Sequence, residues 1–381
     1  MDFSLSDEQT LLRKEIIRFA QQELNQGVAE RDRNQQFPRD LWLKCGEMGL
    51  QGLPVPEEYG GGGLDPLSTA LALEALGYGC HDSGLVFSIC AHLLACVIPV
   101  WKFGSEEQKR RYLPSLCNGS RIAVNAMSEP GSGSDAFAMT TKAVPDDDGF
   151  CISGTKTFGS NGPVADLALV FAVTDAQKGY HGGITAFLVE KEAGFCPGRK
   201  FEKMGLRTSW ISEVSFDDVH VGRDAILGGL GGGASIFTHA MDWERTCLFA
   251  SHIGTMERLL EKAVEYARTR RQFGQTIGKF QAISHRIADM KVKLEAARLL
   301  IYRAASRLER TRAVSLDASL AKVFVSESLL ETALSTVRIF GGYGFMADYE
   351  VERALRDSVA STIYSGTNEM QRNIIARWLG L

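Results

Sequence analysis

The chain has 381 residues, enough for two or three domains, and its 45% hydrophobic and 23% charged residues exclude a disordered chain. Its 42 Lys and Arg against 46 Asp and Glu leave a net charge of −4, which excludes a general electrostatic attraction to nucleic acid or anionic lipid. We therefore expect no nucleic-acid partner and no membrane partner.

The N-terminus, the cysteines and the histidines predict the cellular context. Residues 1–4 lack the basic segment and apolar run of a secretory signal, and no uninterrupted apolar run reaches the roughly 18 residues of a membrane-spanning helix. The eight cysteines include no Cys-x-x-Cys pair, which is typical of reduced thiols. The seven histidines form no close ligand cluster. We expect a cytoplasmic, multidomain protein without a bound metal.

The first third of the chain reads as almost entirely helical. Apolar residues recur at helical spacing over residues 6–33, where Ser6 and Gln9 match a capping box. Two prolines and a glycine run make residues 49–64 a loop. Further helices are predicted at residues 40–48, 66–78, 83–103 and 106–118. We place an N-terminal helical domain at residues 1–121.

The middle of the chain changes to short apolar stretches separated by Gly, Asp and Pro, which predict a β domain at residues 122–230. Strands are expected at residues 122–127, 150–153, 167–173, 184–190 and 213–219. Their spacing favours antiparallel pairing in a small sandwich or barrel.

Helical periodicity returns in a C-terminal domain at residues 231–381. Helices are predicted at residues 236–271, 280–310 and 316–340, with two more after the break at residues 341–344. The order α, β, α narrows the fold class, because most enzymes of this length alternate strands and helices.

The most specific motif is the glycine-rich segment at residues 127–135. A strand that ends in such a turn exposes several backbone N–H groups together and forms an anion-binding nest, to which Ser128 and Ser134 add hydroxyls. The alternative interpretation is an ordinary tight turn. The segment does not match the dinucleotide-binding fingerprint, because no helix follows at the required place.

Four further segments follow in chain order: residues 156–162, residues 270–274 with Gln281, residues 340–345 and residues 363–369. With the first motif, this set resembles the acyl-CoA dehydrogenase flavoprotein family over the whole chain. The resemblance implies a mainly α fold with a middle β domain and a C-terminal four-helix bundle. It also implies FAD bound between these parts and a neighbouring subunit, in a homotetramer.

The resemblance carries over residue by residue to a set of expected FAD contacts. These are Asn125, Met127, Ser128, Gly133, Ser134, Phe158, Ser160, Arg270, Phe273, Gln281, Arg338, Gly341, Gly342, Thr367 and Glu369. Phe158 and Ser160 match positions beside the flavin ring, where Trp and Thr are common in the family. The six residues from Arg270 to Gly342 match contacts to the FAD of a partner subunit, and Arg338 replaces the usual glutamine.

The catalytic base departs from the usual pattern of the family. Most members place a glutamate just before the C-terminal Gly-Thr, to take an α-proton while a hydride leaves the β-carbon. Here that position is Ser365, whose hydroxyl is too weakly basic. Glu244 is the candidate base, as in the isovaleryl-CoA dehydrogenase branch, and an apolar setting would raise its pKa toward working pH. The alternative is a surface residue paired with Arg245 or Arg271.

Ser365 is expected to keep one catalytic task, because its backbone N–H can donate to the thioester carbonyl as negative charge develops there. Substrate contacts are predicted at Met241, Trp243, Arg245, Tyr364 and Gly366.

Within the family the resemblance is nearest to prolyl-carrier-protein dehydrogenases of antibiotic or toxin biosynthesis. These oxidise a prolyl group held on phosphopantetheine to a pyrroline thioester, and the bulky Trp243 beside Glu244 favours such a compact group. An acidic carrier protein would meet a basic patch of Arg199, Lys200, Lys203 and Arg207, unless these residues form only a solvated loop.

Three alternatives remain open at this stage. The substrate is then a short branched acyl-CoA such as isovaleryl-CoA, or the protein is a flavin monooxygenase of the same fold, or a scaffold that has lost its site. The electron acceptor is expected to be an electron-transfer flavoprotein or oxygen. Stoichiometric FAD separates an enzyme from a scaffold, and Glu244 separates a dehydrogenase from a monooxygenase.

Overall fold

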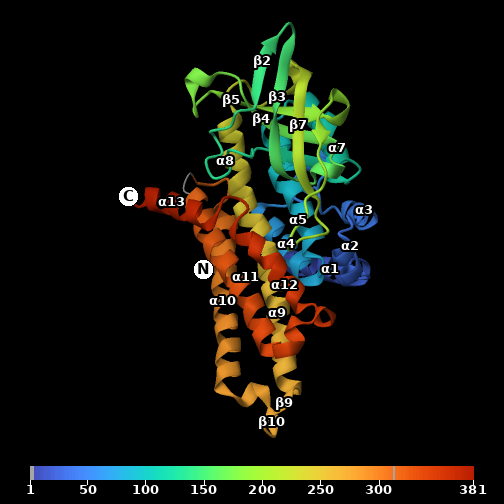
Figure 1. Cartoon of the computed structure of the whole chain (residues 1–381), viewed down its shortest axis with the longest axis vertical. Coiled ribbons are helices and arrows are strands. Elements are labelled where there is room, and N and C mark those ends of the chain that lie inside the picture. The colour runs from blue at the N-terminus through green and yellow to red at the C-terminus, as the bar shows by residue number, and fades with distance from the viewer. Residues whose placement is uncertain (1–3, 312–313) are drawn as a thin grey trace.

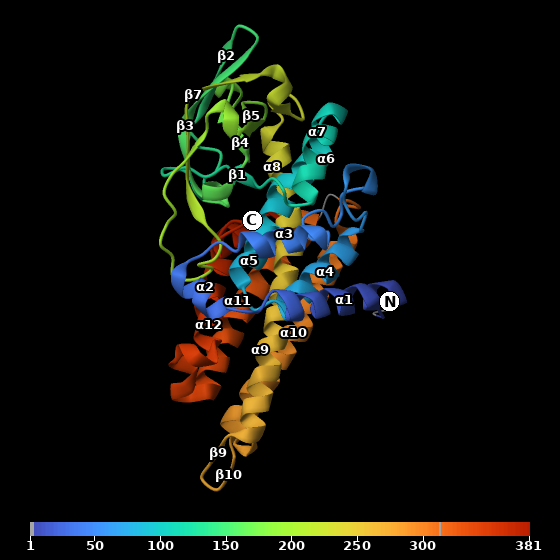
Figure 2. The ribbon, with the colours of Figure 1, turned by 90° about the vertical axis from the view of Figure 1, so that its right-hand side faces the viewer.

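Helices from both ends of the chain pack side by side below an eight-stranded mixed sheet (Figures 1 and 2). The computed structural model describes residues 4–311 and 314–381. The helices of the N-terminal part are α1 (Asp7–Glu23), α2 (Val28–Asn34), α3 (Arg39–Glu47), α4 (Pro66–Gly79), α5 (Ser83–His92), α6 (Ile98–Phe103) and α7 (Glu106–Cys117).

The first predicted helix is correct at its start and wrong in its length. Ser6 Oγ accepts a hydrogen bond from the Gln9 backbone N–H at 3.2 Å, and Gln9 Oε1 accepts one from the Ser6 N–H at 3.1 Å, so the capping box is confirmed. The helix does not continue to residue 33. Gly27 takes a left-handed φ of 71° and starts α2 in a new direction.

The long apolar helix at residues 83–103 crosses the centre of the molecule. It consists of α5, the π-helical turn η2 (Leu93–Val97) and α6. By length and composition it is apolar enough to cross a membrane, contrary to the expectation from the sequence, but 89% of its apolar window is buried inside the protein. The burial identifies it as a core helix.

The sheet joins eight strands in the described part of the chain. They are β1 (Ala123–Ala126), β2 (Lys142–Asp146), β3 (Gly149–Ser160), β4 (Leu167–Val173), β5 (Ile184–Glu190), β6 (Cys196–Pro197), β7 (Ile211–Gly222) and β8 (Ile226–Leu227). The order is β6-β7-β3-β2-β4-β5-β8, with β1 beside β4.

Two expectations for the sheet need correction. β1 runs parallel to β4, with Ala123 opposite Leu167, so the pairing is not antiparallel throughout. Strand β2 was not predicted, because it is largely exposed and polar and contains Pro145, and such an edge-like sequence lacks the apolar signal of a strand.

The C-terminal part is a bundle built on one long interrupted helix. Its elements are α8 (Gly233–Trp243), the π-helical turn η7 (Glu244–Leu248), α9 (Phe249–Thr269), α10 (Gln281–Arg307), α11 (Val314–Phe340), α12 (Val351–Val359) and α13 (Asn368–Trp378). A hairpin of β9 (Arg271–Gln272) and β10 (Gln275–Thr276) joins α9 to α10 at the far end of the bundle (Figure 1). The long helix stops short of Arg271, because Arg270 turns to an extended conformation.

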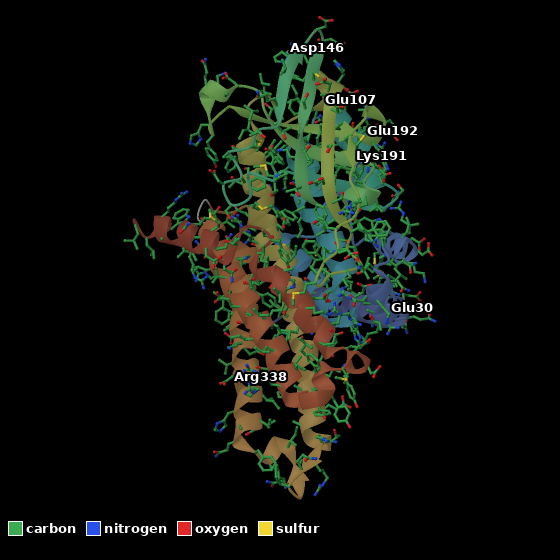
Figure 3. The ribbon with its side chains drawn as sticks, in the orientation of Figure 1. Glu30, Glu107, Asp146, Lys191, Glu192 and Arg338 are labelled. Carbon is green, nitrogen blue, oxygen red and sulfur yellow. The ribbon has the colours of Figure 1, made fainter. Side chains whose placement is uncertain are left out.

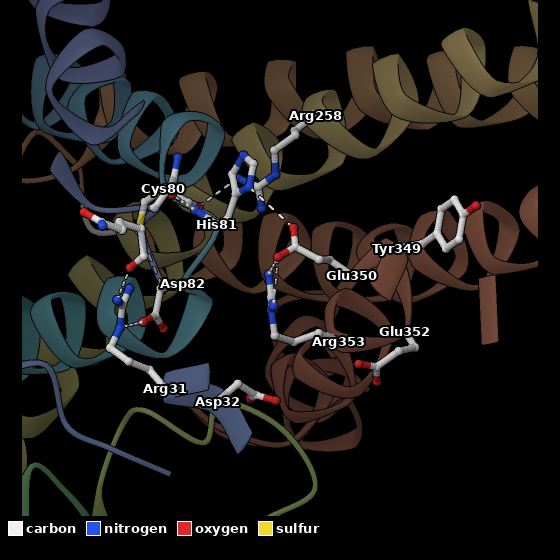
Figure 4. A network of polar contacts seen from close by, with 12 residues as sticks. Arg31, Asp32, Cys80, His81, Asp82, Arg258, Tyr349, Glu350, Glu352 and Arg353 are labelled. Atoms are coloured by element: carbon white, nitrogen blue, oxygen red, sulfur yellow. Dashed lines mark hydrogen bonds and ion pairs between the residues drawn. The ribbon is translucent and has the colours of Figure 1, made fainter. Parts of the chain in front are cut away.

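The N- and C-terminal helices share a core and a polar junction. One cluster of buried apolar residues extends from Ile16 on α1 to Val325 on α11. Figure 4 shows the junction: Arg258 on α9 donates to the Cys80 carbonyl at 2.7 Å, and His81 lies 3.8 Å from the Glu350 carboxylate before α12. The two helical parts therefore form one packed body.

Two π-helical turns meet in this body. Turn η2 contacts turn η7, and both belong to helices that are otherwise regular. A π turn holds an extra residue, often at a functional site. Glu244 is the first residue of η7.

Candidate active site

Glu244 lies inside the protein and not on its surface. Its Oε1 accepts a hydrogen bond from Ser365 Oγ at 2.5 Å, and both side chains are buried. Burial raises the pKa of the Glu244 carboxyl above its ordinary value, while the hydrogen bond from Ser365 and the positive charge of Arg245 oppose that rise. The alternative of a solvated glutamate is excluded because Glu244 is 8% exposed, and Arg271 lies away from it in the β9–β10 hairpin.

Ser365 is held in a special backbone conformation next to this carboxylate. Its φ is 57°, in the left-handed region, and its carbonyl oxygen accepts hydrogen bonds from Arg245 Nε at 3.0 Å and from Gln371 Nε2 at 3.2 Å. Gly366 follows with a φ of 83°, and a Cβ there would lie 2.7 Å from Gln371 Nε2. Two side chains thus hold the turn that presents the Ser365 hydroxyl to Glu244.

A second polar pair lies beside this turn. The Tyr364 hydroxyl is 2.5 Å from His252 Nε2, and the Tyr364 ring packs 4.8 Å from the Phe87 ring. Burial lowers the pKa of His252 to about 3, so its imidazole is neutral at ordinary pH. The pair lines a small cavity of about 20 Å³ that Asp357 and Ser358 also border.

The predicted substrate residues on α8 are buried. Trp243 is 1% exposed and packs edge-on against Trp101 with ring centres 6.5 Å apart, and Met241 is also buried. Within the described chain the Trp243 indole N–H has no hydrogen-bond partner. Asp242, between Met241 and Trp243 in the sequence, accepts a hydrogen bond from Ser315 Oγ, which lies 2.8 and 2.9 Å from the two carboxylate oxygens.

The amino group of Lys322 on α11 is buried and acts on the Glu244 carboxyl through its charge. Its Nζ donates to Asn368 Oδ1 at 2.7 Å and lies 5.6 Å from the centre of the Phe249 ring. Burial lowers the pKa of Lys322 to about 7. Neither Lys322 nor His252 was predicted, because a single Lys or His in an apolar helix carries no motif and only the packing of α11 and α9 brings it to the site.

The glycine-rich segment is tied to β3 by a buried ion pair. Lys156 Nζ contacts Glu129 Oε1 at 2.9 Å and the Met127 carbonyl at 3.0 Å, and the Thr157 N–H donates to the Ser128 carbonyl at 2.8 Å. The sequence pattern did not reveal the Glu129–Lys156 pair, since the two residues are 27 positions apart. The pair sets the predicted flavin loop beside the predicted flavin strand.

The surface around this loop fits a large flat ligand. Phe158 is 69% exposed with a left-handed φ of 55°, at an irregularity in the pairing of β3 with β7. A Cβ at Gly133 would meet nothing within 4 Å, so the backbone there is open to close approach. Asn125 is engaged elsewhere, because its Nδ2 donates to the Ala95 carbonyl in η2 at 2.9 Å. An exposed aromatic ring beside an open glycine turn suits the flavin of FAD.

A second group of predicted FAD residues lies at the other end of the bundle, where Figure 3 labels Arg338 on α11. Phe273 at the β9–β10 hairpin is 91% exposed. A cavity of about 450 Å³ is lined by Arg270, Gly341, Gly342 and Tyr343. At 1.5 Å per helical residue, Arg270 lies roughly 40 Å along the helix from Glu244.

The remaining predicted residues take separate places. Thr367 caps α13 by accepting from the Met370 N–H at 3.3 Å, and Glu369 is exposed in the first turn of that helix. Gln281 begins α10, and Ser160 ends β3.

Three members of the predicted basic patch donate hydrogen bonds to backbone carbonyls of this protein. Lys200 donates to the Gln35 carbonyl, Lys203 to the Ser209 carbonyl, and Arg207 to the Lys203 carbonyl. Of the four, only Arg199 is exposed, and the other three are half-buried. The loop interpretation is therefore favoured over an open basic patch.

Among the described residues, no group of three or more His, Cys, Asp and Glu side chains is placed to hold a metal ion.

Comparison with known proteins identifies the class. Models of the N-terminal, middle and C-terminal domains of acyl-CoA dehydrogenases match residues 6–120, 125–219 and 231–380. The chain belongs to the acyl-CoA dehydrogenase family, as expected from the sequence, and the predicted fold class is confirmed.

Within that family, proteins whose names refer to proline are among the most similar. The chain is 43% identical over 383 residues to an L-prolyl-[peptidyl-carrier protein] dehydrogenase of Pseudomonas fluorescens, with all of both chains covered. The solved structure of the prolyl acyl carrier protein oxidase AnaB matches with a TM-score of 0.97 and 43% identity, covering 99% of this chain and 100% of AnaB. The solved structure of PigA with FAD and proline matches with a TM-score of 0.98 and 40% identity, and all of both chains is covered.

Proposed function

We propose that this chain is a FAD-dependent dehydrogenase that oxidises the α,β bond of a prolyl group held as a thioester on a carrier protein. One observation carries the proposal: a buried glutamate on the η7 turn is held by a serine at the position of the usual base. Full-length similarity to enzymes of this activity supports the choice of substrate.

Glu244 would take the α-proton of the prolyl thioester. Burial raises the pKa of Glu244, which strengthens it as a base once it is ionised. FAD, when bound, supplies the acceptor for the hydride that leaves the β-carbon. One proton and one hydride leave together, and an α,β double bond forms in the ring.

The other residues of the site would bind and polarise the thioester. The backbone N–H of Ser365 would donate to its carbonyl oxygen and stabilise enolate character there. The rings of Trp243 and Tyr364, with Met241, would bound a compact apolar space, with Arg245 and Gly366 shaping the turn. Met127, Ser128, Gly133, Ser134, Phe158 and Ser160 would hold the flavin.

The second group of FAD residues supports an assembly. We propose a homotetramer in which Arg270, Phe273, Gln281, Arg338, Gly341 and Gly342 bind the FAD of a partner subunit. We further propose a reducing cytoplasmic location, because all eight cysteines are free and six of them are buried. Domain boundaries near residues 121 and 230 also stay predictions.

An anaerobic experiment tests the substrate. The protein is mixed with prolyl-loaded carrier protein or with isovaleryl-CoA, and loss of the flavin absorption band is followed. We expect prolyl-carrier protein to bleach the band much faster. Bleaching by isovaleryl-CoA alone would overturn the substrate, and bleaching by neither would overturn the proposed activity. Admitting air or an electron-transfer flavoprotein afterwards identifies the electron acceptor from the recovery of the band.

A further inference from the structure

The side chain of Ser365 contacts the candidate base directly, in addition to the backbone role expected from the sequence. Its Oγ–H is the only hydroxyl that donates to the Glu244 carboxylate in the described part of the chain, at 2.5 Å. The two residues are 121 positions apart in the sequence, so the contact is not formed within one helix or turn. The contact exists because the 364–367 turn packs against the η7 turn.

The backbone of Ser365 is fixed from two sides. Arg245 comes from η7 and Gln371 from α13, and both donate to the Ser365 carbonyl oxygen. A non-glycine residue in the left-handed region costs about 1 kcal/mol or more, and it persists only where its surroundings hold it. The two anchors hold the backbone of Ser365 beside Glu244, and the hydroxyl points to the Glu244 carboxylate.

We propose that Ser365 is a positioning residue whose side-chain hydroxyl holds the Glu244 carboxylate in its ionised, catalytically competent state. This inference rests on the proposed role of Glu244 as the base. A donor to a carboxylate favours the charged form, and a buried carboxylate has few other sources of such stabilisation. Ser365 therefore stands where most family members have the catalytic glutamate, and its side chain supports Glu244, the proposed base here.

Other charged or titratable groups also face Glu244. They are Arg245 on its own turn, Lys322 on α11, Cys90 on α5, Cys96 on η2 and Tyr364 before α13. Burial raises the pKa of both thiols and of the Tyr364 phenol, so these three stay neutral. Lys322 titrates near neutral pH, so the test needs a readout specific to a carboxyl group.

The test removes the hydroxyl and keeps the backbone N–H. Ser365→Ala retains a side chain, and Ser365→Gly also relieves the left-handed strain, so together they separate the hydroxyl from backbone effects. The pKa of Glu244 is read from the infrared carbonyl band of its protonated carboxyl, assigned by its absence in Glu244→Gln. We expect both serine variants to raise that pKa by about one to two units. The rise of the flavin-reduction rate with pH should move alkaline by the same amount.

Ser361→Ala is the matched control, because Ser361 is a buried serine whose Oγ donates only to the Ser358 carbonyl. It should leave both titrations unchanged. An unchanged Glu244 band in Ser365→Ala and Ser365→Gly would overturn the positioning role, even if Glu244→Gln is inactive. Full flavin reduction by Glu244→Gln would overturn the base assignment instead, so the two failures are distinguishable.

Discussion

At the scale of single residues, the site depends on the burial of a carboxyl group, which the sequence around it does not predict. Glu244 carries an ionisable carboxyl group, yet its side chain is buried and has one hydroxyl donor. Ionising a buried carboxyl group costs free energy, so a carboxyl group in this position indicates a functional role.

We expect Glu244→Gln to keep the flavin spectrum and the fold while flavin reduction falls at least about a hundredfold, the usual scale for losing a general base. Stopped-flow reduction by prolyl-carrier protein measures this. Glu265→Gln on the exposed face of α9 is the control. A rate within a fewfold of the parent would show that Glu244 is not the base.

The Glu129–Lys156 pair gives a prediction about pH. Burial disfavours the charged carboxylate, but hydrogen bonds from Thr141 and Thr140 outweigh it and lower the pKa of Glu129 to about 2, from an ordinary value of 4.5. A depressed pKa contributes stability that is present above pH 4.5 and lost as the pH falls toward 2.

Glu129→Gln should therefore lower Tm by several degrees near pH 7, and the difference from the parent should shrink between about pH 4.5 and pH 2. Differential scanning calorimetry across this range is the measurement. A difference in Tm that does not change with pH would contradict the stabilising role assigned to the ionised Glu129 carboxylate.

At the scale of elements, close helix packing positions the active-site turn. Where helices α4 and α9 cross, a glycine of each helix lies against the backbone of the other. A Cβ at Gly254 would lie 2.0 Å from the Glu74 carbonyl oxygen, and one at Gly77 would lie 1.9 Å from the Ser251 carbonyl oxygen. This crossing sets how α9, and with it the η7 turn, lies against the core.

Gly254→Ala should push the two helices apart and destabilise the protein by about 1–3 kcal/mol, the usual cost of overpacking. Denaturant unfolding measures the change. Gly198→Ala is the control, because its Cβ would make only an ordinary contact of 3.4 Å with Glu213. Equal stability of both variants would mean that the crossing relaxes without cost.

At the scale of the whole molecule, the residues predicted to bind FAD lie in two separate groups on one chain. Phe158, predicted to contact the flavin, lies on strand β3 of the sheet, and the cavity lined by Arg270 lies at the opposite end of the bundle (Figure 1). The proposed tetramer explains both, because a partner would bring the second half to the first.

We expect sedimentation to give four times the chain mass, and dilution to release FAD as subunits separate. Phe273→Ala should release FAD at higher protein concentration than the parent, whereas Val144→Ala on the exposed strand β2 should not. A folded monomer that retains FAD at nanomolar concentration would refute the shared site.

Much of the fold was predictable because its signals are local. The capping box at Ser6, the limits of β4 and β5, and the order of helices and strands follow from periodicity and turn residues that neighbours in the sequence supply. The breaks at Gly27 and at the two π turns were not predicted, since a left-handed residue or an extra residue in a turn leaves the apolar periodicity almost unchanged.

The sequence by itself determined the family, the fold class and the identity of the candidate base, because these depend on motifs and on which residue types are present. Only the tertiary structure decided that Glu244 is buried, that the Ser365 side chain holds it, and that His252, Lys322 and the Glu129–Lys156 pair lie at the site. Those contacts join residues far apart in the chain, and the free energy of burying them is set by the packing of α9, α11 and the sheet together.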